Sequence, residues 1–429
     1  MNSRIRAKLL PFAIASLLAT AVPAIAQDTS SSISGRVLDA NGQPVAGATV
    51  QIVHEPSGTT KIATTDANGR YSSQGLRVGG PFDVTVSKAG MAQAEQDNVY
   101  LQLAQETPVN LTMGGASEQA ATNLSGVTVS ANSLAQTFSA DNKGISTNVS
   151  SREIEATPTP DRSIQNIVRL DPRIVVTDRA AGSFSAIGQN SRYNNITVDS
   201  VSANDPFGLN ANGLPTLSTP ISQDTIEEYN ISTANYDVAT RRGVGAAVNA
   251  VTKSGTNQFH GSVYYVYRNA KDLVGDAGWL PSDNPGYHYK GYQKDTTYGF
   301  NVGGPIIKDK LFFFVSAEHE KTTGIGADSA NGLDNSLGNG ASTSNKVSPG
   351  DLQKVIDAAK QLGLTPGVFG GASGLTYDDK RYLGKIDWNI SNDHRASFTY
   401  QNTKEQLPAV GGNSPSSVGL TSYTYTKAI

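Results

Sequence analysis

The sequence contains no cysteine, and its charges nearly cancel. Without cysteine there can be no disulfide and no metal site built from thiolates. The 429 residues carry 34 lysines and arginines against 37 aspartates and glutamates, so the basic excess typical of nucleic-acid-binding proteins is missing. The five histidines are scattered, and no Ser/His/Asp or paired-carboxylate arrangement predicts a catalytic site. We therefore expect no enzyme, no resident metal and no cofactor.

Glycine is abundant, with 43 residues, and the 17 tyrosines outnumber the 12 phenylalanines and two tryptophans. This balance, together with many Asn, Ser and Thr residues, is typical of a β-rich protein with many turns. The length predicts about three domains.

The first 26 residues have the features of a cleaved secretory signal. Arg4, Arg6 and Lys8 precede an apolar run over 9–21, and an A-x-A cleavage site follows at 24–26. The alternative is a membrane anchor, but the apolar run is too short to span a bilayer comfortably. Export without cysteine fits the envelope of a Gram-negative bacterium.

Residues 32–113 predict a small all-β sandwich, because short alternating runs are separated by turn signals. The tetrapeptide Asp-Ala-Asn-Gly occurs at 39–42 and again at 66–69. We expect its Asn-Gly pair to supply the positive φ values that a tight hairpin requires. The single histidine of this segment, His54, is expected to be solvated at a strand end.

The stretches "SGRVLDANGQPVAGATVQI" and "TTDANGRYSSQGLRVGGPFDVTVSKAG" resemble the carboxypeptidase regulatory-like domain. This resemblance implies a transthyretin-like β-sandwich that packs or binds, with carbohydrate as one candidate ligand, and does not imply peptidase chemistry.

Residues 114–140 have the Gly-, Ser-, Ala- and Gln-rich composition of a linker. Inside it lies a β-prone heptad, Leu124, Ser125, Gly126, Val127, Thr128, Val129 and Ser130. On composition alone the heptad is a stray linker segment or an edge strand of the next domain.

Residues 141–255 predict a compact α+β unit of short strands and polar loops. We expect one short helix with Asp161 as its N-cap and with Ile164, Ile167, Val168 and Leu170 on one face.

Residues 259–429 change to long alternating strands, clearest over 259–269 and 381–402. Connections alternate between short turns, at 305–310 and 391–394, and a long loop, at 322–376, in which a helix from Pro349 to Gly363 is expected. Apolar-out, polar-in segments with this alternation indicate an antiparallel transmembrane β-barrel. The alternative is a soluble antiparallel sheet with one wet face.

The order of these segments resembles a TonB-dependent outer-membrane receptor of the Oar-like subgroup. The resemblance rests on "NNITVDSV", on "TIEEYNIST", on "RRGVGAAVNAVTKSGTNQFHGSVYYVYRN" and on "NVGGPIIKDKLFFFVSAEHEK". Ser200 stands where the plug motif usually has Gly, and Gln189 where an Arg-Gly pair is usual. The resemblance implies a sandwich, an α+β plug and a barrel. About six strands are expected, the last near 421–426, against about 22 in plugged transporters, so we expect an N-terminal fragment.

The resemblance also implies energy-coupled uptake of a peptide, protein or carbohydrate across the outer membrane, with the sandwich in the periplasm. A TonB-type periplasmic protein would bind the heptad by adding it as a strand. Ligand contacts are expected from the loop 322–376 and from four plug residues: Asp205, Phe207, Asn210 and Asn212. The competing hypotheses are an outer-membrane adhesion protein that binds through its sandwich, and a soluble carbohydrate-binding module.

Overall fold

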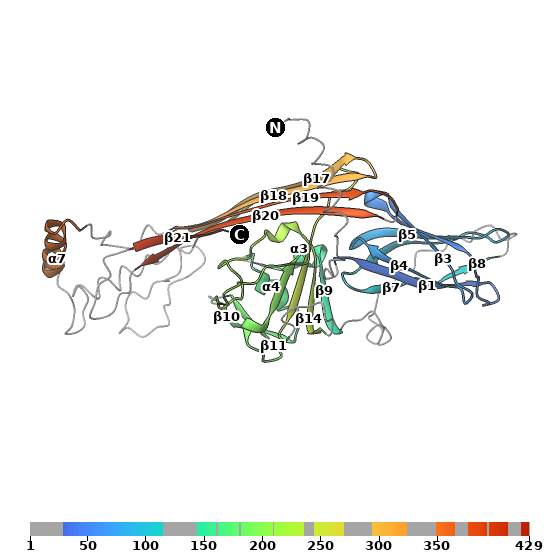
Figure 1. Ribbon diagram of the computed structural model, residues 1–429, viewed down its shortest axis with the longest axis horizontal. Coiled ribbons are helices and arrows are strands. Elements are labelled where there is room, and N and C mark those ends of the chain that lie inside the picture. The colour runs from blue at the N-terminus through green and yellow to red at the C-terminus, as the bar shows by residue number, and fades with distance from the viewer. Residues whose placement is uncertain are drawn as a thin grey trace, which may run out of the picture.

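The computed structural model describes residues 29–114, 144–159, 162–179, 182–208, 210–235, 244–269, 294–323, 349–364, 376–392, 394–410 and 422–428. Figure 1 shows three parts along the chain: an N-terminal sandwich (β1 to β8), a central unit (β9 to β15 with its short helices) and a curved sheet (β16 to β21). The expected mainly β fold is confirmed.

The sandwich consists of two four-stranded sheets that enclose one apolar core. The first contains β1 Ser31–Asp39, β4 Arg70–Leu76, β7 Glu106–Pro108 and β8 Leu111–Met113. The second has the order β3-β2-β5-β6, with bounds Thr59–Thr64, Thr49–His54, Gly79–Ser87 and Ala94–Leu101. Alternate residues point inward, as the period of two requires, so that Val50, Ile52, Phe82, Val84 and Val86 are buried.

The repeated Asp-Ala-Asn-Gly segments form turns, as expected, but with a different backbone conformation. Only the glycines have positive φ, 78° at Gly42 and 72° at Gly69, whereas the asparagines do not. The carboxylate of Asp39 accepts the N–H groups of Asn41 and Gln43, at 2.9 and 2.8 Å, and Asp66 repeats this arrangement. The aspartate therefore fixes the turn, and the left-handed conformation is needed at one residue only.

The central unit is built on a mixed five-stranded sheet with the order β13-β12-β15-β14-β9. The bounds are Val201–Ser202, Asn195–Val198, Ala247–Thr252, Ile226–Asn235 and Gly144–Ser150. A separate hairpin pairs β10 Ile174–Asp178 with β11 Ser183–Ala186, and 3₁₀ turns occupy Ser191–Tyr193 and Gln223–Thr225. This is the compact α+β unit that the sequence predicts.

The helices of the central unit differ in detail from the expectation. The predicted helix is α4 Ile164–Val168, but its N-cap is Ser163, and Asp161 lies outside the described residues. Leu170 follows the helix and is 43% exposed, so it does not belong to the buried face. A second helix, α3 Ser151–Ala156, was not predicted, although its capping box of Ser150 and Glu153 is visible in the sequence.

Ser200 adopts the backbone conformation for which glycine is usual at this position. Asp199 and Ser200 form the two-residue connection between β12 and β13, with φ values of 45° and 69°. Both residues of a type I′ turn require positive φ. Ser200, which stands where the resembled motif usually has glycine, adopts the positive φ that the hairpin requires.

The curved sheet pairs its six antiparallel strands in chain order. They are β16 His260–Asn269, β17 Lys294–Ile307, β18 Leu311–Thr323, β19 Thr376–Asn389, β20 Arg395–Val410 and β21 Ser422–Ala428. The outer face is apolar and exposed: Val263, Tyr265, Trp388 and Phe398 are 87%, 65%, 50% and 67% exposed. The inner face is buried against the central unit and is mostly polar, with Phe312, Phe314 and Leu383 as its buried apolar residues. The predicted alternation is thus confirmed.

The two ends of the curved sheet differ. β17 and β18, and likewise β19 and β20, are joined by short turns at one end, whereas the connection from β18 to β19 at the other end contains helix α7 Pro349–Gln361. Gly363 closes this helix with φ of 72°, as the sequence predicts. In Figure 1 the sandwich lies at the short-turn end and α7 beyond the opposite end. No helix among the described residues is long and apolar enough to cross a membrane.

The central unit and the curved sheet share one apolar core. Phe314 of β18 and Leu383 of β19 are 0% and 5% exposed, and both belong to the cluster formed by the central unit's own residues, among them Phe184, Tyr229 and Ile231. The sheet therefore contributes side chains that complete the core of the unit it covers.

Candidate functional site

The sequence predicts two sets of functional residues, and the structure describes one of them. The heptad 124–130 lies outside the described residues. The four residues expected to bind ligand, Asp205, Phe207, Asn210 and Asn212, lie in the loop between β13 and the 3₁₀ turn at 223–225.

Three of those four side chains hold their own loop together. The carboxylate of Asp205 accepts the N–H groups of Phe207 and Asn210, each at 3.0 Å. Asn210 and Asn212 donate to carbonyl oxygens further along the loop, at 2.7 and 2.8 Å. Phe207 is different, because its side chain is 83% exposed. Of the four, only Phe207 has a side chain that projects into solvent.

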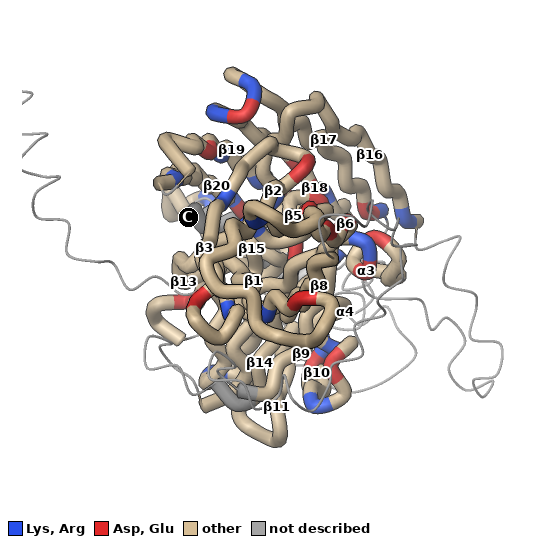
Figure 2. The backbone as a smooth tube through the Cα atoms, turned by 90° about the vertical axis from the view of Figure 1, so that its right-hand side faces the viewer, with Lys and Arg blue, Asp and Glu red and all other residues tan. Residues whose placement is uncertain are grey.

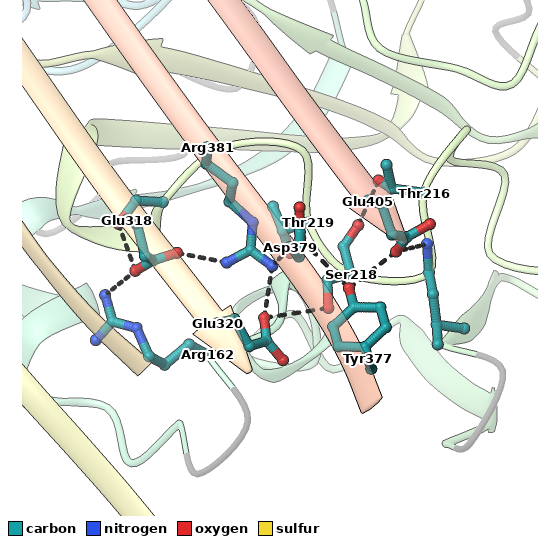
Figure 3. A network of polar contacts seen from close by, with 12 residues as sticks. Arg162, Thr216, Ser218, Thr219, Glu318, Glu320, Tyr377, Asp379, Arg381 and Glu405 are labelled. Carbon is teal, nitrogen blue, oxygen red and sulfur yellow. Dashed lines mark hydrogen bonds and ion pairs between the residues drawn. The ribbon is translucent and has the colours of Figure 1, made fainter. Parts of the chain in front are cut away.

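A polar network that the sequence analysis missed joins the inner face of the curved sheet to the central unit (Figure 3). At its centre is Arg381 of β19, whose side chain is 5% exposed. Its guanidinium donates to Glu318, and to Glu320 and Asp379 at 2.6 Å each. One buried cation thus holds three carboxylates from two adjacent strands.

Glu318 is the main link from this network to the central unit. Its Oε2 accepts hydrogen bonds from Ser222 at 2.8 Å and Tyr264 at 2.7 Å, and lies 3.2 Å from the guanidinium of Arg162. Arg162 also pairs with Asp224. Because the carboxylate has partners on both sides, its charge is stabilised although its side chain is 1% exposed.

A second link lies one strand further along the sheet. The backbone N–H of Leu217 donates to Oε1 of Glu405 at 2.8 Å, and Tyr377 donates to the same oxygen at 2.8 Å. Ser218 donates to Glu320 at 3.4 Å, and Thr403 donates to the carbonyl of Pro220. The loop 214–222 is therefore hydrogen-bonded to strands β18 and β20 of the sheet.

A third link lies nearer the short-turn end. Lys385 donates to the carbonyl and the hydroxyl of Thr252 at 3.0 and 3.1 Å, and lies 3.7 Å from Asp199. Thr399 donates to Asp199 at 3.2 Å. The turn that contains Asp199 and Ser200 is thus held directly against the sheet.

These contacts are polar and specific, and water can replace them if the two surfaces separate. Buried ion pairs add little net stability relative to apolar packing, yet they fix the relative position of the groups that they join. These polar contacts therefore fix how the central unit lies against the sheet, alongside the apolar contacts of Phe314 and Leu383. The signal in the sequence is the alternation over 381–402, which predicts the direction in which Lys385 and Asp387 face but not the partners that they meet.

His54 is not solvated, in contrast to the expectation. It is 6% exposed, its Nδ1 lies 2.7 Å from Ser57 Oγ, and its ring packs 4.7 Å from that of Phe82. Burial, with Arg77 and Arg395 nearby, lowers the pKa of His54 to about 3, so the ring is neutral. Among the described residues no group of three or more His, Cys, Asp or Glu side chains is arranged to hold a metal ion.

Two family models match the chain. The carboxypeptidase regulatory-like domain matches residues 32–114, and an outer membrane beta barrel domain matches residues 251–428. The second range contains all six strands of the curved sheet.

Two curated proteins share sequence with the chain. It is 27% identical over 424 residues to the TonB-dependent transporter Oar of Myxococcus xanthus, covering 91% of this chain and 35% of the relative. It is 39% identical over 109 residues to chitinase ChiA of Flavobacterium johnsoniae, covering 23% of this chain and 7% of the relative. The chain thus spans 35% of the length of the first relative.

Among solved structures, the siderophore receptor PirA of Acinetobacter baumannii is 17% identical, with a TM-score of 0.39, over 66% of this chain and 43% of that one. PirA of Pseudomonas aeruginosa is 13% identical, with a TM-score of 0.36, over 61% of this chain and 36% of that one.

Proposed function

Because the chain belongs to the Oar-like TonB-dependent receptors, we propose that it serves the energy-coupled uptake of a ligand across the outer membrane. In this proposal the curved sheet is barrel wall and the central unit is the plug. The observation that supports it is the set of polar contacts from the inner face of the sheet, where Glu318, Glu405 and Lys385 bind the central unit. A plug that must move needs contacts that water can replace, and these contacts are of that kind.

The coupling segment is proposed to be the heptad 124–130. It lies in the connection between β8, the last strand of the sandwich, and β9. β9 is an edge strand of the central sheet and pairs only with β14 among the described strands. Force applied to the connection would act on this edge strand first, because the connection leads directly into it. A periplasmic partner that adds the heptad to its own sheet would supply that force.

The proposed orientation follows from the two ends of the curved sheet. Short turns face the periplasm and long loops face the outside in outer-membrane barrels. The position of the sandwich at the short-turn end supports a periplasmic sandwich. Ligand contacts are assigned to the loop 322–376 and to the exposed Phe207. The ligand class remains a peptide, a protein or a carbohydrate.

The test replaces Val127 by proline, which removes one main-chain donor and fixes φ. The matched control is Ala121→Pro, the same change in the same linker but outside the heptad. We expect Val127→Pro to abolish ligand-dependent growth while surface ligand binding persists, and Ala121→Pro to leave both unchanged.

A second readout does not depend on the ligand. Since the chain has no native cysteine, Val129→Cys provides a unique thiol for disulfide trapping with a cysteine placed in the periplasmic energy-transducing protein. If disulfide trapping occurs in the parent and Val127→Pro abolishes it, the result supports coupling through the heptad. If Val127→Pro shows normal growth and normal trapping, the heptad has no coupling role and is only a linker. That result would favour the adhesion hypothesis, in which the barrel is only an anchor.

A further inference from the structure

The sandwich docks against both other parts of the molecule at the short-turn end. Figure 2, viewed from that end, shows sandwich strands in front of strands of the central unit and of the curved sheet. We call the contacting residues of the sandwich its docking surface: Pro56, Thr59, Arg77, Val78, Leu103 and Gln105.

Toward the central unit, the docking surface binds the strands β9 and β14. The backbone N–H of Leu103 donates to Glu228 Oε1 at 2.8 Å, and the amide of Asn148 donates to the carbonyl of Leu103 at 3.0 Å. Gln105 in turn donates to Asn148 Oδ1 at 2.9 Å. Asn148 lies on β9, the edge strand into which the linker leads. The sandwich therefore holds the strand that the proposed coupling force would move.

Toward the curved sheet, the docking surface contacts the short turns and strand ends. The backbone N–H of Asn257 donates to the carbonyl of Pro56 at 2.7 Å, and Asn389 donates to Thr59 Oγ1 at 2.9 Å. The guanidinium of Arg77 lies 5.4 Å from the ring centroid of Phe312. These contacts place the sandwich across the end through which a ligand would leave toward the periplasm.

The docked interface is much less apolar than the core of the sandwich itself. Its buried apolar cluster contains three residues, Val78, Leu103 and Val251, whereas the sandwich core contains sixteen. The sandwich has its own core, so leaving the interface need not unfold it. Interfaces of this polar kind between parts of one chain permit relative motion.

The packing between the three parts is also incomplete. A cavity of about 1570 Å³ is lined by residues of all three, among them Arg77, Asp199 and Asp387. Arg77 Nε and Nη2, Asp387 Oδ2 and Asn389 Oδ1 are buried without a hydrogen-bond partner within the described part of the chain. Buried polar atoms without partners weaken an interface, because water would satisfy them on release.

We propose that the sandwich is a releasable stopper, which in the resting receptor closes the periplasmic end and holds β9 and β14, and which undocks before the plug rearranges. The proposal rests on the proposed function for its biological meaning. Undocking itself is a property of the molecule and is measurable without ligand or uptake.

The experiment compares thiol labelling at two positions of β15 in the purified receptor. Val251→Cys lies under Leu103 and Val78, whereas Val248→Cys lies in the core of the central unit, where Val248 is 1% exposed. The probe is a small maleimide, and the chain offers no other cysteine. We expect Val251→Cys to react at least about tenfold faster than Val248→Cys, because undocking is a smaller opening than unfolding of the central unit.

Two further variants tie the labelling to the sandwich. The pair Pro56→Cys and Asn257→Cys, whose backbones are hydrogen-bonded, forms a disulfide that locks the docked state. The lock should slow labelling at residue 251 to the rate at residue 248. Reduction with dithiothreitol, which is removed before the maleimide is added, should restore the rate. Labelling is read by mass spectrometry on the peptide that contains residue 251, because the two thiols of the reduced lock also react. Leu103→Asp, outside the sandwich core, should accelerate labelling at residue 251 only.

Equal labelling rates at residues 251 and 248 would overturn the proposal. The proposal would also be overturned if neither the disulfide lock nor Leu103→Asp changes the labelling rate at residue 251. If these variants behave as expected but Val127→Pro receptors support normal growth, then undocking stands and coupling through the heptad fails.

Discussion

Glu228 is the buried carboxyl group whose replacement gives the most quantitative test of the structure. It is 4% exposed, and its Oε1 accepts the N–H of Leu103 and the amide of Asn148. Burial raises the pKa of Glu228 from 4.5 to about 7, and the nearby carboxylates of Glu227 and Glu153 add to the effect, while the two hydrogen bonds oppose it. At 1.36 kcal/mol for each tenfold change in acidity, this corresponds to about 3 kcal/mol.

The sign of the pH effect follows from the raised pKa of Glu228. Between pH 4.5 and about 7, native Glu228 retains a proton that the opened chain has released. The native state is therefore favoured at low pH and loses this advantage as the pH rises through about 7. Glu228→Gln keeps both acceptor contacts without ever carrying a charge. Relative to the parent, the variant should be nearly unchanged at pH 4.5 and about 3 kcal/mol more stable by pH 8.

The assay is hydrogen exchange followed by mass spectrometry on the peptide that covers β14 Ile226–Asn235. Opening free energies come from protection factors at several pH values, corrected for intrinsic exchange. Glu106→Gln, the same change at a half-buried position of sandwich strand β7, is the matched control. A stability difference that stays flat with pH, or that has the opposite sign, would refute the burial argument for Glu228.

Two other substitutions test how the central unit is held to the curved sheet, each by thermal unfolding in detergent. Arg381→Met leaves three buried carboxylates without their shared cation and should lower the free energy of unfolding by about 3–5 kcal/mol. Its control is Lys380→Met, at a side chain 44% exposed, which should change stability very little. Equal losses in the two variants would contradict the network. Phe314→Ala removes a fully buried ring from the shared core and should cost about 3–5 kcal/mol. Phe398→Ala, on the outer face and 67% exposed, is its control, and a comparable loss there would show that the inner face has been assigned wrongly.

The strands were the most predictable part of the molecule, because their signal is local. In β19 Thr376–Asn389, Tyr382, Ile386 and Trp388 are exposed while Lys385 and Asp387 are buried, as the alternation in the sequence predicts. Helix α7 and the glycine that closes it, Gly363, were also predicted from local capping signals. The prediction of positive φ at the asparagines of the two Asp-Ala-Asn-Gly turns was wrong. The aspartate side chain fixes each turn, so only the glycine needs the left-handed conformation.

The candidate site was predictable only in part. Alternation shows that Glu318 and Arg381 face inward, but it cannot show that they meet each other, or that Arg162, 156 residues before Glu318, lies beside them. Such pairs depend on how the sheet and the central unit are superposed, for which the sequence carries no local signal. His54 was misjudged for a similar reason, since its ring packs against Phe82, which is distant in the sequence, and since the charges of Arg77 and Arg395 help to lower its pKa.

The shared core of the central unit and the curved sheet constrains biogenesis. Phe314 and Leu383 follow the entire central unit in the chain, yet they complete its interior. A newly exported chain therefore cannot finish the central unit before these strands arrive. Until then its apolar residues remain accessible, and the segment depends on protection from aggregation during transit. Assembly of the curved sheet and the central unit becomes a single cooperative event, so a mutation in either should reduce the amount of both.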